Sequence, residues 1–251
     1  MQLTTNGIVL ADWKNEDDRV LAILTEDRGL LTAYANGANK LRSRLAASTE
    51  LLCYSRFVLF SNRGRYVVDA ADSIRIFFGI RSDIEKLALG SYFAALCREF
   101  CPQGQTGGET AAMLRLLLNS LHFLENEKKS RDMLKPLFEL RLLTLAGFMP
   151  GLVACRDCAC FESDEMLFLP ETAEIVCGSC AQNADKLHGA PLTKGALAAM
   201  RHTVYAPPEK LFSFALSPEG LALLGGAAER YMTARLEKSL PALEFYHSLR
   251  L

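Results

Sequence analysis

Residues 155–180 read CRDCACFESDEMLFLPETAEIVCGSC, and this stretch contains five of the chain's eight cysteines. It opens with Cys155-Arg156-Asp157-Cys158 and closes with Cys177-Gly178-Ser179-Cys180, two Cys-x-x-Cys pairs separated by 18 residues. Two intervening residues let the backbone turn so that both sulfurs of a pair point at one ion, and two such pairs at this spacing supply the four thiolates of a tetrahedral zinc site. The spacing therefore predicts one zinc ion, held by Cys155, Cys158, Cys177 and Cys180.

The ligand set favours a closed, structural zinc. A catalytic zinc keeps one position open and usually has three protein ligands, often including histidine. Here four thiols are available, and of the four histidines only His188 is near them in the sequence. Neither His-Glu-x-x-His nor the deaminase pair of His-x-Glu and Pro-Cys-x-x-Cys occurs. Short strands predicted at 166–169 and 173–176 give the plan of a zinc ribbon or knuckle.

The residues alone leave three alternatives open for the cysteines. Cys160 is a fifth thiol that is either a spare or a replacement for Cys158 as ligand. A thioredoxin-like redox role is a second alternative, although it needs one Cys-x-x-Cys on a βαβ unit and not two facing pairs. The third is a set of buried apolar cysteines without a metal.

Length and composition place the chain among globular proteins. It has 251 residues, of which 50% are hydrophobic, enough for one large domain or two smaller ones. Residues 1–12 lack the basic region and apolar run of a signal peptide. The most apolar stretch, 136–152, contains Glu139 and Arg141, so no membrane span is expected. We therefore expect a cytoplasmic protein with reduced thiols, no membrane partner and no small-molecule substrate.

The first part of the chain has the pattern of short strands joined by tight turns. Glu26-Asp27-Arg28-Gly29 and Asn62-Arg63-Gly64 are good turn sequences. Five strands in so short a segment fit a small closed barrel such as an OB-fold, predicted as a domain over residues 1–80. The segments enriched in β-branched and aromatic residues are 6–13, 19–24, 30–35, 51–60 and 65–74.

From Asp83 onward the apolar period changes from two to about 3.6, which indicates helices. We expect an all-α domain over residues 81–251, interrupted at 150–190 by the zinc-binding element. The fold class is thus α+β with more than one domain. The predicted helices begin near Asp83 and continue at 110–124, 131–148, 193–205 and 218–238.

Positive charge is concentrated in the barrel segment, although the whole chain has a net charge of −1. Between residues 36 and 65 the only acidic residue is Glu50. Basic side chains follow phosphates and exposed aromatic rings stack on bases, so a DNA-binding surface is predicted here. The alternative is that the nearby aromatics, Tyr34, Tyr54, Phe57 and Tyr66, face the core and the cations form a solvated face. The six basic residues are Lys40, Arg42, Arg44, Arg56, Arg63 and Arg65.

Several segments resemble the RecO family of bacterial DNA repair proteins. Residues 6–10 (NGIVL), 24–31 (LTEDRGLL) and 37–43 (GANKLRS) resemble that family's amino-terminal OB domain. Residues 138–143 (FELRLL) and 147–150 (GFMP) resemble its helical domain. The resemblance runs through nearly the whole chain in order.

This resemblance implies a recombination mediator and not an enzyme. Such proteins bind single- and double-stranded DNA, anneal complementary strands, and work with RecR to load RecA onto DNA coated by single-strand-binding protein. The resemblance also implies a cytoplasmic protein that associates with the bacterial nucleoid. The family's basic motif corresponds here to Lys40, Arg42 and Arg44, with Asn39 where a second adjacent basic residue is common.

The family also binds the acidic, Phe-ended tail of single-strand-binding protein in its helical domain. A basic-rimmed apolar groove for this tail would lie beside Leu134 and Leu137, although a solvated helix start explains the same charges. The candidate residues are Lys128, Lys129, Arg131 and Lys135.

Two other classes of protein compete with this interpretation. One is a zinc-ribbon adaptor that binds only proteins, with the barrel as a docking surface and no direct DNA contact. The other is a zinc hydrolase or deaminase, which would need an open metal position. Salt-sensitive binding to single strands separates the DNA-binding class from the adaptor.

Overall fold

The structure is a computed structural model and describes residues 2–62, 64–104, 107–182 and 189–249. Contacts divide the chain into two compact units. The first comprises Met1–Lys128 and Leu240–Leu251, and the second comprises Lys129–Ser239. The second unit is therefore inserted in the sequence of the first.

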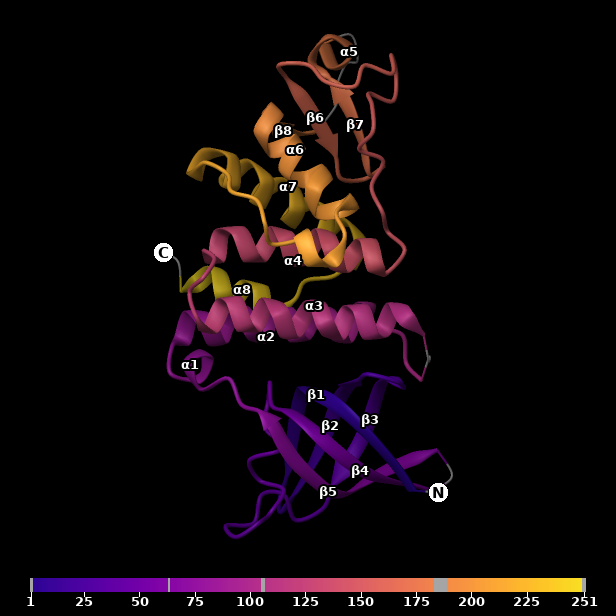
Figure 1. Cartoon of the computed structure of the whole chain (residues 1–251), viewed down its shortest axis with the longest axis vertical. Coiled ribbons are helices and arrows are strands. Elements are labelled where there is room, and N and C mark those ends of the chain that lie inside the picture. Colours follow the sequence, from indigo (N-terminus) through magenta and orange to yellow (C-terminus); the bar gives the residue numbers. More distant parts are fainter. Residues whose placement is uncertain (1, 63, 105–106, 183–188, 250–251) are drawn as a thin grey trace. The chain divides into compact units, whose positions relative to one another are not determined.

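The first unit begins with a closed five-stranded barrel, as expected from the sequence (Figure 1). The strands follow one another around the barrel in the order β1-β2-β3-β5-β4, and β4 pairs with β1 to close it. Alternate side chains point inward, and Val9, Ile23 and Phe57 are fully buried in the interior. The strands are β1 (Gln2–Asn15), β2 (Asp18–Thr25), β3 (Gly29–Ala35), β4 (Tyr54–Asn62) and β5 (Arg65–Arg75).

A long connection, residues 36–53, joins β3 to β4. These strands are not neighbours because β5 lies between them and pairs in parallel with β3. The prediction of a strand from residue 51 was three residues too long at its start. Leu52 has a φ of 61°, and its N–H donates to the Val9 carbonyl at 2.8 Å, so the connection ends against β1 before β4 begins.

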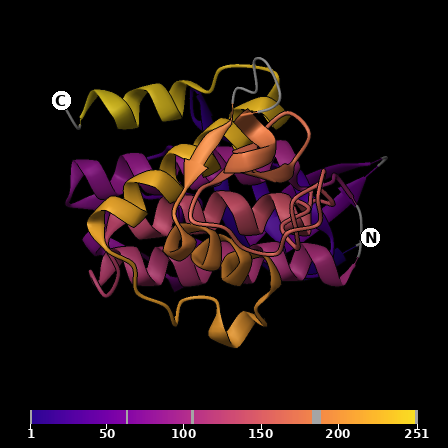
Figure 2. The same cartoon turned by 90° about the horizontal axis from the view of Figure 1, so that it is seen from above.

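The described residues of the first unit also form four helices: α1 (Phe78–Arg81), α2 (Ile84–Phe100), α3 (Gly108–Glu125) and α8 (Pro241–Ser248). Asp83 caps α2, because its carboxylate accepts the N–H groups of Glu85 and Lys86. Helix α2 packs against both α3 and α8 (Figures 1 and 2). The sequence predicted α2 and α3, whereas α1 and α8 were not predicted.

The second unit combines three longer helices with a small sheet. The sheet has the order β7-β6-β8, with both strand pairs antiparallel, and β8 contacts α7 (Figure 2). The helices are α4 (Arg131–Leu145), α6 (Lys194–Tyr205) and α7 (Pro218–Leu236), and the strands are β6 (Met166–Leu169), β7 (Glu174–Cys177) and β8 (Ala190–Leu192). The short helices α5 (Gly178–Gln182) and η1 (Pro208–Lys210) lie between them in the chain.

Local sequence explains where these helices begin and end. Ser130, Thr193 and Ser217 cap α4, α6 and α7, and the side chain of each accepts the backbone N–H of the third residue of its helix. Helix α4 was predicted to reach residue 148 but ends at Leu145. Gly147 adopts a φ of 90°, and the N–H of Phe148 turns back to the Leu143 carbonyl at 2.8 Å.

A buried cluster of charges joins α4 to α7. The Lys135 ammonium lies 2.7 Å from Glu139 and 2.6 Å from Glu229, and the Lys135 side chain is only 7% exposed. Burial lowers the pKa of Lys135, but the two carboxylates outweigh it and raise the pKa above the usual lysine value. A raised lysine pKa stabilises the folded state fully at neutral pH, and this contribution is lost only as pH rises through the folded pKa.

In the part of the chain that the structure describes, no helix has both the length and the apolar composition needed to cross a bilayer.

Replacing Lys135 by Met should lower the free energy of unfolding by about 3–5 kcal/mol, because Glu139 loses the buried cation beside it. Urea unfolding followed by circular dichroism measures this change. The exposed Lys210→Met is the matched control and should change little. Adding Glu139→Leu to Lys135→Met should restore part of the loss. Wild-type stability in Lys135→Met would contradict the buried cluster.

Candidate functional site

The four predicted cysteines come together at one end of the small sheet. The sulfurs of Cys155, Cys158, Cys177 and Cys180 all lie within 4.8 Å of one another, and those of Cys158 and Cys177 are 3.6 Å apart. A tetrahedral zinc with Zn–S bonds of 2.3 Å requires sulfurs about 3.8 Å apart. The cluster therefore has the composition and size of a four-thiolate metal site, and these residues could hold a metal ion.

Backbone hydrogen bonds shape the first Cys-x-x-Cys pair. The Cys177 N–H donates to the Cys155 sulfur at 3.4 Å, and the Arg156 N–H donates to the Ile175 carbonyl at 3.0 Å, so this pair is tied to β7. Burial raises the pKa of the Cys155 thiol, but N–H groups of Cys177, Cys158 and Asp157 outweigh it and lower the pKa to about 6. The thiolate, which is the metal-binding form, is thereby favoured.

Cys160 lies outside this cluster. Its thiol donates to the Glu162 carbonyl at 3.1 Å, while its own carbonyl accepts the Cys155 N–H at 2.8 Å. Ala159, between the two thiols, has a φ of 58°, which turns the chain after Cys158. The structure thus groups Cys158, and not Cys160, with the other three cysteines.

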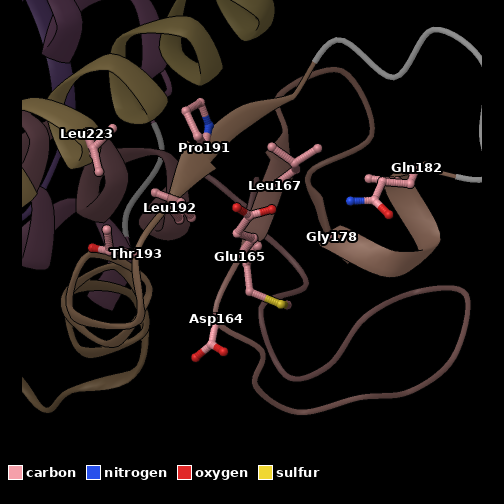
Figure 3. A pocket seen from close by; sticks show the side chains of 11 residues that line it. Asp164, Glu165, Leu167, Gly178, Gln182, Pro191, Leu192, Thr193 and Leu223 are labelled. Carbon is pink, nitrogen blue, oxygen red and sulfur yellow. The ribbon is translucent and has the colours of Figure 1, made fainter.

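A pocket of about 460 Å³ lies beside the small sheet and was not anticipated from the sequence (Figure 3). Apolar side chains such as Leu192 and Leu223 line it together with the carboxyl-bearing Asp164 and Glu165. Asp164 pairs with Lys194 at 2.9 Å. Residues 155–182 contain six acidic side chains and one basic one. Such a surface repels phosphates, so DNA contact is not expected here.

Three of the six predicted cations, Lys40, Arg42 and Arg44, lie in the connection between β3 and β4, and all three are exposed. Lys40 makes an exposed ion pair with Asp17 at 3.6 Å. Among the described residues, no carboxylate lies within ion-pair distance of Arg42 or Arg44. We call residues 37–45, which carry these three cations, the basic loop.

Arg19 and Asn39 hold the base of the basic loop, and sequence reasoning did not identify this role. The Arg19 guanidinium is almost fully buried and donates to the Asn39 side chain at 2.6 Å, the Ala46 carbonyl at 2.9 Å and the Thr49 hydroxyl at 3.2 Å. The Asn39 amide donates in turn to the carbonyls of Glu16 and Asp18, at 3.0 and 2.9 Å. Asn39 therefore links Arg19 to the hairpin between β1 and β2 and positions the basic loop.

The remaining cations of the set lie on strands. Arg65, at the start of β5, stacks over the Tyr34 ring with 3.8 Å between the guanidinium carbon and the ring centroid. Arg56 lies exposed on β4, opposite Asp72 on β5, and shares a surface pocket with Glu26 and Asp27. Arg63 falls outside the described residues.

The predicted aromatics divide between the core and partly exposed positions. Phe57 is fully buried in the barrel interior and Tyr66 packs against that core. Tyr34 lies under Arg65, and Tyr54 lines a pocket with Arg75 and Phe77. The one acidic residue of the basic segment, Glu50, pairs with Arg81 on α1. It therefore does not pair with the basic loop.

The four helical-domain cations predicted to bind a partner do not form one exposed group. Lys128 is exposed and ends the first unit. Lys129 begins the second unit, where its ammonium lies 3.5 Å from the Phe214 carbonyl, and Arg131 starts α4. The expectation that Lys135 forms part of an exposed rim needs correction, because Lys135 is buried against Glu139 and Glu229.

Comparison with known proteins agrees with this architecture. Residues 1–77 match the family described as "Recombination protein O N terminal", and residues 81–244 match "Recombination protein O C terminal". The DNA repair protein RecO of Acetivibrio thermocellus is 35% identical over 249 residues, covering 98% of this chain and 97% of the relative. The protein of the same name from Symbiobacterium thermophilum is 31% identical over 250 residues, covering 98% and 96%.

The barrel segment and the segment that follows it both match families of recombination proteins, and the relatives carry the name of a DNA repair protein. The chain is therefore a protein of DNA repair and recombination. The chain belongs to the RecO family.

Replacing Asn39 by Ala should loosen the basic loop, because three hydrogen bonds of its side chain are lost, each worth about 0.5–1.5 kcal/mol. Amide hydrogen exchange across residues 40–46 should become about tenfold faster or more. The melting temperature should also fall, because the buried Arg19 guanidinium loses its Asn39 acceptor. The neighbouring exposed Asn15→Ala is the matched control. Unchanged exchange in Asn39→Ala would show that the hydrogen bonds of the Asn39 side chain do not hold the loop.

Proposed function

We propose that this protein is a non-enzymatic recombination mediator that binds single- and double-stranded DNA through the basic loop. It anneals complementary strands and works with RecR to load RecA onto DNA coated by single-strand-binding protein. The observation that carries the proposal is the basic loop itself, with Lys40, Arg42 and Arg44 exposed on a segment held by buried Arg19. Membership of the RecO family supports the same role.

Annealing requires no bond to be made or broken, so the work of the protein is electrostatic. Exposed cations bind phosphates and displace counterions, which lowers the repulsion between two approaching strands. Because these contacts go to the backbone, the base edges stay accessible for pairing. Arg65, Arg56 and Arg63 are proposed to extend the contact beyond the loop, with Arg65 already stacked on Tyr34 as a flat cationic surface.

The four clustered thiols are proposed to hold one structural zinc ion. Bound zinc would supply a cross-link between the turn at Cys155–Cys158 and the start of α5. The sulfur spacing and the hydrogen bonds to Cys155 support this assignment. The acidic surroundings support a role in stability and not in DNA contact.

A second candidate function, a protein-binding adaptor without direct DNA contact, is favoured by one observation. The pocket beside the small sheet combines apolar side chains with Asp164 and Glu165, a surface that suits a protein partner better than a nucleic acid. Salt-sensitive binding to single strands separates the two functions.

From the role in repair we propose RecR and single-strand-binding protein as partners. The same role places the protein in the cytoplasm, in association with the nucleoid. For the acidic tail of single-strand-binding protein, Lys128, Lys129 and Arg131 remain the proposed contacts. Lys135 is left out of this set because its ammonium is buried in ion pairs with Glu139 and Glu229.

Replacing Lys40, Arg42 and Arg44 together by Ala should weaken binding to single-stranded DNA similarly for all sequences. The slope of log K against log salt should become less negative by about 2, since each phosphate contact contributes about −0.7. Fluorescence anisotropy with a labelled oligonucleotide across a salt series measures both quantities. The control removes three exposed cations elsewhere, Arg115, Lys210 and Lys238. Equal slopes in the two triple variants would place the DNA contact outside the loop.

Replacing Cys177 by Ser should remove the zinc and destabilise the second unit, because structural zinc contributes about 10–16 kcal/mol to folding in small peptides. Cys160→Ser is the matched control and should keep about one zinc per chain. Metal content by atomic emission on freshly reduced protein, together with thermal unfolding, tests both variants. Stoichiometric zinc in Cys177→Ser, or its loss in Cys160→Ser, would refute the assigned ligands.

A further inference from the structure

Leu41 is completely exposed, with a relative accessibility of 101%, at the tip of the basic loop. Burying a leucine side chain stabilises a folded protein, and none of this stabilisation is gained at Leu41 when the chain folds. A single exposed leucine is common on protein surfaces. At Leu41, however, exposed cations stand directly on both sides, Lys40 before it and Arg42 after it.

The tip of the loop is held in a defined conformation. Consecutive turns bracket Leu41, with Lys40 N–H donating to the Gly37 carbonyl at 3.2 Å and Ser43 N–H donating to the Lys40 carbonyl at 2.9 Å. On the far side of the tip, Leu45 packs against the barrel core. Together with the hydrogen bond between Arg19 and Asn39, these contacts fix both ends of a short segment. The Leu41 side chain lies in the middle of this segment and points into solvent.

We propose that Leu41 acts as an apolar wedge that inserts between neighbouring bases of the DNA bound by the basic loop. This inference rests on the proposed function, because the loop must first bind DNA. Leucine is among the apolar side chains that proteins insert between base steps, where they unstack the bases at a cost in free energy. Phosphate contacts by Lys40 and Arg42, on either side of the wedge, would offset that cost.

Insertion of Leu41 would let the basic loop separate stacked bases as well as bind phosphates. A single strand whose stacking is interrupted at one step presents separated bases, and separated bases are more open to a complementary strand. A leucine between cations also suits an anionic membrane surface. DNA is the favoured ligand, because the chain belongs to a DNA repair family.

The experiment uses a single-stranded oligonucleotide with one 2-aminopurine between adenines, whose fluorescence rises when its stacking is lost. The full-length protein should raise this fluorescence at saturation. Leu41→Ser should reduce the rise at least threefold and weaken binding about tenfold, which corresponds to about 1.4 kcal/mol. Leu41→Met should keep both effects. The salt slope should be the same in all three proteins, since the cations are retained.

The matched control is Ile84→Ser, which removes another exposed apolar side chain of the first unit, on α2. It should behave like the wild type. Melting temperatures should be equal for all variants, because Leu41 and Ile84 are both exposed.

Each contrary outcome has a distinct meaning. Salt-dependent binding by the wild type without a fluorescence rise, or an equal rise in Leu41→Ser, overturns the wedge and leaves the proposed DNA binding intact. No binding by the wild type removes the proposed function and the wedge together. If Leu41→Ser alters only binding to phosphatidylglycerol vesicles, the loop tip is a membrane contact and the wedge is wrong.

Discussion

Parallel pairing of β3 with β5 is the constraint on which the first unit depends. Two residue pairs, Ala33 with Tyr66 and Tyr34 with Val67, close the barrel at this seam. Because β5 takes the place beside β3, the chain leaving β3 cannot turn back as a hairpin and must reach β4 by a longer path. The segment that carries the basic loop is thus a consequence of strand order.

Arg19 links the stability of that barrel to the geometry of the loop. A buried guanidinium is costly unless its donors are satisfied, and Asn39, Ala46 and Thr49 supply acceptors from three points of the connection between β3 and β4. The loop is therefore ordered before any ligand arrives. Ordering a loop in advance lowers the entropy lost on binding, which favours affinity without additional contacts.

Local signals in the sequence were sufficient for the barrel strands, the longer helices and the four-cysteine cluster, because alternation and Cys-x-x-Cys spacing act over a few residues. Interactions between distant residues were not predictable. Lys135 has Glu139 one turn away, but its second carboxylate, Glu229, belongs to α7. Likewise, Arg19 and Asn39 show no periodic pattern that joins them. The DNA-contacting role of the six cations stays a prediction, with three of them placed on one loop.

The second unit interrupts the first, since α8 follows Lys129–Ser239 in the chain yet packs on α2. During synthesis on the ribosome, the barrel and helices α1–α3 emerge early, while α8 emerges only after the whole second unit has been made. Domains generally fold as units in the order of their translation. The apolar surface of α2 that α8 covers therefore stays exposed until the second unit has been synthesised. This exposed surface is a natural binding site for a chaperone on the nascent chain.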